Sequence, residues 1–93
     1  MSEMIELLMD VRKEVRCAEK YAREANKHMH EYPELAQVYH RIASEKLSHA
    51  EMLNDQAEMM AEKAGMTPVW DVEDAMFEMD KQVVKDCLDN RRK

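Results

Sequence analysis

Apolar residues recur with helical spacing in three stretches of the chain, and two short breaks separate these stretches. In the first stretch, residues 2–30, steps of three and four residues alternate as in a heptad seam. This pattern predicts one long helix, with Ser2 as its N-cap. The seam narrows to alanine in its second half, which would let another helix approach closely. Its members are Met4, Leu8, Val11, Val15, Ala18, Ala22, Ala25 and Met29.

The first break lies at Pro33, and a second helix is predicted to start there. Proline disfavours helical geometry at Tyr32 and suits the first turn of a helix. The helical pattern then continues to Ala64, and Gly65 is placed to end it as a C-cap glycine. We therefore predict a helix over residues 33–64. Because the connection to the first helix is short, the two helices should form an antiparallel hairpin.

Two ionisable residues, Lys46 and His49, fall within the apolar stripe of this second helix. On a helical wheel, Lys46 lies close to the centre of the stripe, His49 lies a little to one side, and Glu45 lies further out on the same flank. An unpaired buried charge is very costly, so Lys46 should find a carboxylate partner unless the stripe bends around it. The apolar members are Leu35, Val38, Tyr39, Ile42, Ala43, Ala50, Leu53, Ala57, Met60 and Ala64.

A third helix is predicted over residues 68–90, with Thr67 as its N-cap and Pro68 at its first position. Its apolar face has two edges, and Asp80 and Glu73 lie on the line between them, so this helix carries acids inside its stripe. One edge consists of Val69, Val72, Met76, Met79, Val83 and Cys87, and the other of Phe77, Val84 and Leu88.

The composition favours a single all-α domain. The chain has 93 residues, of which 45% are hydrophobic and 37% charged, with only one Gly and two Pro. Few turn formers beside many helix formers indicate long helices with short connections. A chain this short buries a limited core, and oligomerisation is a common way to enlarge it.

Charge and cysteine usage exclude several classes of partner. The net charge of −6 argues against nucleic acid, because phosphate binding needs a basic face. The basic cluster Arg91-Arg92-Lys93 is interpreted as a solvated tail. Cys17 and Cys87 show no metal-ligand spacing and are expected to be free thiols. With no signal peptide and no membrane-length apolar run, we expect a soluble, cytoplasmic protein that does not contact a membrane.

The second helix resembles the corresponding helix of rubrerythrin-type ferritin-like proteins. A tyrosine at the hairpin is followed by small and aromatic residues, and then by a His-Ala pair, in the order and spacing of that family. The likeness covers about residues 12–64, and the third helix has no clear counterpart. The residues that carry it are Tyr32, Leu35, Ala36, Tyr39, Ile42, Ala43, His49, Ala50 and Leu53; Tyr21, Ala22 and Ala25 are similar to the family's first helix more loosely.

The resemblance implies a scaffold that holds two iron or manganese ions between four helices, with a Glu from one helix and a Glu-x-x-His pair from the next. A chain of half that length would rebuild the four-helix core as a dimer. His49 matches the ligand histidine, but Lys46 stands where the family has its ligand glutamate. On the first helix the ligand position falls near Arg12 or Lys13, with Glu14 beside it.

Two alternative sets of metal ligands are possible, and so is an arrangement that binds no metal. Glu45 and His49 share a face four residues apart and could bind one ion with Glu14 or Glu19. In the second possibility, Asp80 or Glu73 joins His49 as a ligand. We favour the interpretation that no metal binds and that Lys46 forms an internal ion pair with Asp80, Glu73 or a glutamate of the first helix. A small-molecule pocket with Lys46 or His49 as base is a further possibility.

We therefore expect an all-α homodimer whose hairpin is ferritin-like, with a monomeric three-helix bundle as the alternative. No cofactor is expected unless iron or manganese binds. No nucleophile, phosphate-binding loop or well-spaced acid–base pair supports an enzyme. The preferred function is a non-catalytic homo-oligomeric scaffold or interaction module with a degenerate di-metal site. The alternative is a metal-binding protein for iron or manganese handling or oxidative stress.

Overall fold

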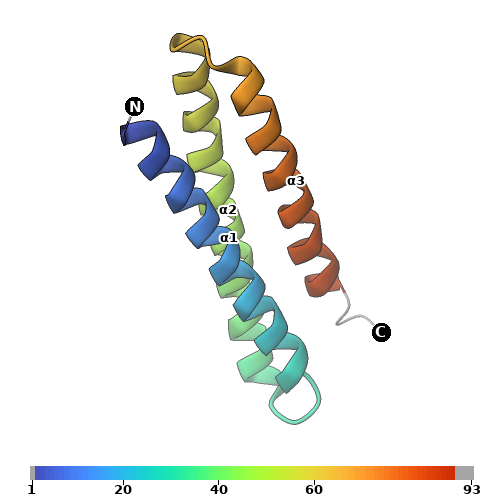
Figure 1. The fold of residues 1–93 in the computed structure, drawn as a ribbon. Helices are drawn as coiled ribbons and strands as arrows, with labels where there is room; N and C mark the ends of the chain where they lie inside the picture. Colours follow the sequence, from blue (N-terminus) through green and yellow to red (C-terminus); the bar gives the residue numbers. More distant parts are fainter. Residues whose placement is uncertain (1, 90–93) are drawn as a thin grey trace.

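A computed structural model describes residues 2–89 and contains three helices, with no strand among these residues. They are α1 (Ser2–His28), α2 (Pro33–Lys63) and α3 (Thr67–Asp89). α1 and α2 form a long antiparallel hairpin, and α3 lies alongside both, pointing in the same direction as α1 (Figure 1). The all-α prediction is confirmed; the starts of α1 and α2 agree with the prediction, and the ends of α1 and α2 and the start of α3 lie within two residues of it. The predicted end at Asn90 and the basic tail lie outside the described residues.

Local backbone chemistry sets both breaks. Before α2, the carbonyl of Tyr32 accepts the first helical hydrogen bond, from the Ala36 N–H at 2.9 Å. After α2, Gly65 adopts a φ of 68°, and the Met66 N–H reaches back to the Ala61 carbonyl at 2.8 Å. This is the Schellman arrangement, in which glycine takes the left-handed conformation that a side chain would strain. The predicted glycine C-cap is therefore confirmed.

The start of α3 differs slightly from the prediction. Thr67 is the first residue of the helix rather than its N-cap, since the Trp70 N–H donates to the carbonyl of Met66 at 2.9 Å. Pro68 is then the second helical residue. At this position a backbone N–H has no partner within the helix, so proline loses no hydrogen bond there. The sequence Met66-Thr67-Pro68 thus turns the chain sharply from α2 into α3.

The core lies between α1 and α2, and α3 closes part of it. The predicted seam of α1 is confirmed, because most of its members are buried and the alanines allow close packing. From α1 the core takes Met4, Val11, Val15, Ala18, Ala22 and Ala25; Leu8 and Met29 are half-buried at its edge.

The buried face of α2 is rotated from the predicted one. Leu35 and Val38 were expected to face the core and are instead exposed, while Leu47 and Asn54 point inward. Lys46 therefore lies at the edge of the buried face rather than at its centre. The residues of α2 that are buried are Ala36, Ala43, Leu47, Ala50, Asn54, Ala57 and Ala61.

Only one of the two apolar edges of α3 packs against the hairpin. The edge with Phe77, Val84 and Leu88 is buried, together with Trp70, which the sequence pattern had not placed in the core. Five of the six members of the other edge, from Val69 to Val83, lie in solvent, and Cys87 alone is half-buried. Within the described residues, none of the helices combines the length and apolar character needed to cross a bilayer.

Candidate functional site

Lys46 and Glu14 form an ion pair across the hairpin. Lys46 Nζ on α2 lies 3.3 Å from Glu14 Oε2 on α1, and the two side chains are 34% and 24% exposed. The predicted internal partner of Lys46 is thus the glutamate of the first helix rather than Asp80 or Glu73. Glu14 Oε2 is buried and accepts no hydrogen bond of good geometry from the described residues. The ammonium group of Lys46 therefore lies between the two helices, at the position where the resemblance implies metal ligands.

The predicted metal-ligating residues do not come together within one chain. Glu45 and His49 are both exposed on α2, on the far side of Lys46 from the core. Glu19 instead contacts Arg23 of its own helix, with Arg23 Nη2 at 3.4 Å from Glu19 Oε2. Across residues 2–89, no group of three or more His, Cys, Asp or Glu side chains is close enough to hold a metal ion.

The two candidate acids of α3 have separate surroundings. Glu73 lies beside α1, where Arg12 Nη2 donates to its Oε1 at 3.1 Å and to its Oε2 at 2.8 Å. Asp80 is exposed, and no ion pair involves it within the described part of the chain. Neither acid reaches His49, so a site combining them with His49 could form only between chains.

An aromatic cluster extends the face that carries the Lys46–Glu14 pair. Tyr21 stacks on Tyr39 with a centroid distance of 5.7 Å, and His28 stacks on the other end of the cluster, 5.9 Å from Tyr39. This cluster was not predicted from the sequence. Its signal is the seven-residue spacing of Glu14, Tyr21 and His28, matched by Tyr39 and Lys46 on the facing helix.

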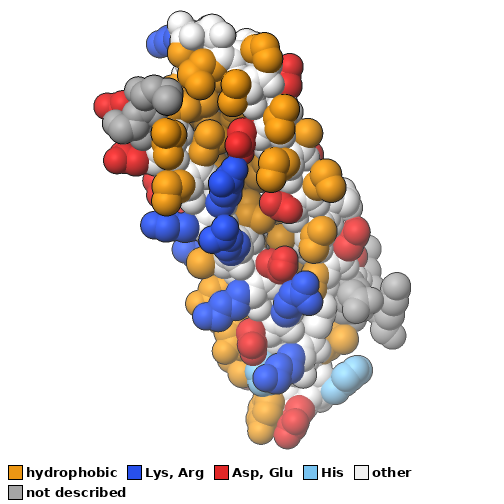
Figure 2. Space-filling view, in the orientation of Figure 1, with side chains coloured by type: hydrophobic (Ala, Val, Ile, Leu, Met, Phe, Trp, Pro, Cys, Tyr) orange, Lys and Arg blue, Asp and Glu red, His pale blue; other side chains and the backbone are white. Residues whose placement is uncertain are grey.

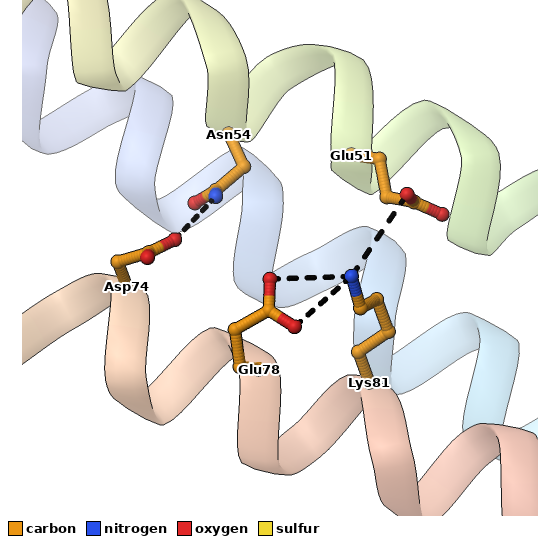
Figure 3. Close-up of polar contacts among 5 residues, drawn as sticks. All are labelled: Glu51, Asn54, Asp74, Glu78 and Lys81. Atoms are coloured by element: carbon orange, nitrogen blue, oxygen red, sulfur yellow. Dashed lines mark hydrogen bonds and ion pairs between the residues drawn. The ribbon is translucent and has the colours of Figure 1, made fainter.

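Polar contacts hold α3 against α2 (Figure 3). Asn54 Nδ2 donates to Asp74 Oδ1 at 3.0 Å, and Asn54 is the buried polar residue among those described, with 5% of its surface exposed. Further along the same seam, Lys81 Nζ lies 3.0 Å from Glu78 Oε2 and 3.9 Å from Glu51 Oε2. A buried polar contact such as that of Asn54 fixes the register of two helices more surely than it adds stability.

The most unusual feature is the exposed apolar edge of α3, which we call the α3 stripe. Its residues are 48–70% exposed, and they follow the three–four spacing of a coiled-coil seam. At a rise of about 1.5 Å per residue, the stripe is roughly 21 Å long. Hydrophobic side chains line α3 in Figure 2, on the face that it shares with α1. The α3 stripe consists of Val69, Val72, Met76, Met79 and Val83.

The apolar surface continues onto the beginning of α1. Ile5 and Met9 are about half exposed, and they precede Arg12 by seven and three residues on the same face. Since Arg12 contacts Glu73, these two side chains lie next to the upper end of the α3 stripe. Together the seven residues, each 48–70% exposed, form an apolar surface that continues from α3 onto α1. Exposed apolar surface that is gathered in this way is typical of interaction sites.

No family model matches the sequence, and neither a curated protein nor a solved structure matches it. The resemblance to rubrerythrin-type proteins therefore rests on the sequence pattern of about residues 12–64 alone.

Proposed function

We propose that this protein is a non-catalytic helical interaction module that assembles with copies of itself through the α3 stripe. The exposed heptad spacing of the stripe is the observation that carries the proposal. A coiled-coil seam is stabilised only when a second helix covers it. An apolar surface of this size on a small domain is typical of an interaction site.

The Lys46–Glu14 ion pair between α1 and α2 supports a degenerate di-metal site on a ferritin-like scaffold. Lys46 neutralises Glu14 where the resemblance implies a metal bridging the two helices. An ammonium group 3.3 Å from the carboxylate supplies the positive charge that a metal would otherwise bring, and it repels a second cation. The hairpin thus needs no metal to balance its inward-facing carboxylate.

The interaction proposal is tested by the mass of the protein in solution. Light scattering of the untagged protein should give a mass above the 11.0 kDa of one chain. Met79→Glu places a charge in the α3 stripe and should return the mass to one chain. Met52→Glu is the matched control, because Met52 on α2 is similarly exposed, at 64% against 70% for Met79. A monomeric parent, or equal behaviour of the two variants, would overturn the proposal.

The degenerate site is tested separately by metal analysis. After incubation with iron, manganese and zinc and removal of the excess, the protein should retain no stoichiometric metal. Retention of about one metal per chain, lost in His49→Ala, would instead assign the protein to the metal-binding class through Glu45 and His49.

A further inference from the structure

We infer that the occupant of the α3 stripe is α1 of a second copy, and that the two copies are parallel, related by a two-fold axis along the helices. This inference rests on the proposed self-association and adds the partner surface and its orientation. The partner surface is a row of residues on α1 that we call the α1 stripe. It consists of Ile5, Met9, Arg12, Arg16, Arg23 and Lys27.

Residues 12–28 of α1 and the whole of α3 carry net charges of opposite sign. Between residues 12 and 28, α1 carries six Lys or Arg against three Glu, whereas α3 carries seven Asp or Glu against two Lys. Figure 2 shows Lys and Arg side chains along α1 beside the hydrophobic row of α3. Of the acids of α3, Asp74 and Glu78 lie on the side that faces α2, and Glu73 pairs with Arg12 of its own chain. Asp80 and Asp86 remain beside the α3 stripe, where the basic side chains of a second copy's α1 would complement their charge.

The register between α1 and α3 determines which residues of the two copies lie at the same height. Two contacts, Arg12 with Glu73 and Asn26 with the Cys87 carbonyl, both join residues 61 apart in sequence. α1 and α3 therefore run in parallel, and residue i of α1 lies at the height of residue i+61 of α3. Rotation about an axis parallel to the helices leaves every residue at its height, so the same offset governs contacts between the two copies.

In this register, apolar residues of α1 face apolar residues of the partner's α3, and basic residues of α1 face acidic ones. Ile5 and Met9 lie at the heights of Met66 and Trp70, where the partner copy presents the upper end of its α3 stripe. Below them, Arg16 and Arg23 lie at the heights of residues 77 and 84. There the partner presents Met79, Val83 and the acids Asp80 and Asp86, so arginine stems cover apolar surface while their charged ends reach carboxylates.

The antiparallel arrangement fits poorly. A two-fold axis across the helices would lay α1 on α1 and α3 on α3 of the partner. It would place the acids around one α3 stripe against those of the other, and the basic halves of the two α1 helices together. Like charges across an interface select against the wrong arrangement.

The apolar surface available to such a dimer is substantial. A standard protein interface buries about 800 Å² per partner, and seven apolar residues that are each 48–70% exposed can supply a large part of it. The flanking arginines add further contact area at the rim.

A mixing experiment tests the pairing of α1 with α3 of the partner. Arg16→Glu and Asp80→Lys each place like charges together at both symmetry-related contacts, so each variant alone should dissociate at roughly tenfold higher concentration than the parent. In an equimolar mixture, the new glutamate of the first variant meets the new lysine of the second. At the other contact of the same dimer, the unchanged Arg16 meets the unchanged Asp80. The mixture should return to within about threefold of the parent. Changes within one chain cannot produce this rescue, because each chain keeps its own substitution.

Spin labels test the orientation. A nitroxide at Thr67→Cys, in a chain with Cys17→Ser and Cys87→Ser, marks one end of the molecule. In the parallel dimer the two labels should lie within about 25 Å, since packed helices are 8–10 Å apart. In an antiparallel dimer the length of α3 would separate them by about 35 Å or more. A dimer with the long distance, or with no rescue on mixing, would overturn the inference and leave the proposed function standing. A monomeric parent would overturn both.

Discussion

Exchanging one amide for a carboxylate at Asn54 should weaken the attachment of α3 to the hairpin. Asn54 is 5% exposed, and its Nδ2 donates to Asp74 Oδ1 at 3.0 Å, at the closest polar contact between α2 and α3 (Figure 3). Asn54→Asp keeps the shape of the side chain and replaces the donor with a second carboxylate. The hydrogen bond is lost, and two negative charges face each other in a largely buried place.

The magnitude follows from that geometry. Two charges about 4 Å apart at an effective dielectric constant of about 20 repel by about 4 kcal/mol, which sets the upper end. The lost hydrogen bond to a charged group contributes about 1.5–3 kcal/mol. Relaxation of α3 away from α2 relieves part of the repulsion, so we expect a loss of about 2–4 kcal/mol in the free energy of unfolding.

Urea unfolding at pH 7, followed by far-ultraviolet circular dichroism at fixed protein concentration, measures this loss. Gln56→Glu adds the same charge two residues along α2 at an exposed position and should change stability by less than about 0.5 kcal/mol. The double variant Asn54→Asp/Asp74→Asn reverses the donor and acceptor and should recover most of the loss. A change below about 0.5 kcal/mol for Asn54→Asp, or no recovery in the double variant, would refute the packing of α3 described above.

Three further substitutions, one of them with a matched control, probe the rest of the fold by the same unfolding assay. Lys46→Met should cost about 1–3 kcal/mol, because it removes the ammonium group beside the buried Glu14 Oε2; a change below about 0.5 kcal/mol would mean that the Glu14 carboxylate needs no partner. Val84→Ala should lower the free energy of unfolding by about 2 kcal/mol, since Val84 is fully buried. Val83→Ala, at the adjacent exposed position, should change it by almost nothing in dilute, monomeric protein. Equal effects of the two substitutions would contradict the orientation of α3. Gly65→Ala should cost about 1 kcal/mol through the φ of 68° alone, because a Cβ there meets nothing within 4 Å; a neutral result would show that the turn can rearrange.

The helices and their breaks could be predicted from the sequence because their signals are local. Pro33 and Gly65 act through the backbone of a few neighbouring residues, and the apolar seam of α1 leaves one helix face to bury. The face of α2 was harder to assign. Its apolar residues cover a wide arc, from Leu35 and Val38 on one side to Leu47 on the other, and only the position of α3 decides which part is buried.

The same limit explains the candidate site. The partner of Lys46 could be narrowed to a few acids, but choosing Glu14 required the relative rotation of α1 and α2 in the hairpin. In α3, both apolar edges have regular helical spacing, so periodicity alone could not tell that Trp70 and Phe77 are buried while Val72 and Met79 face solvent. Residues that look equivalent in sequence are distinguished only by what packs against them.

Methionine oxidation would test most directly whether the α3 stripe is covered in solution. The parent chain carries exposed methionines both in the stripe, at Met76 and Met79, and on α2, at Met52 and Met59, with exposed fractions of 49–70%. Mild peroxide treatment at low and high protein concentration, followed by peptide mass spectrometry, gives the oxidation rate of each. We predict that Met76 and Met79 become protected as the concentration rises, while Met52 and Met59 keep their rates. Equal rates for all four methionines at every concentration would contradict the account.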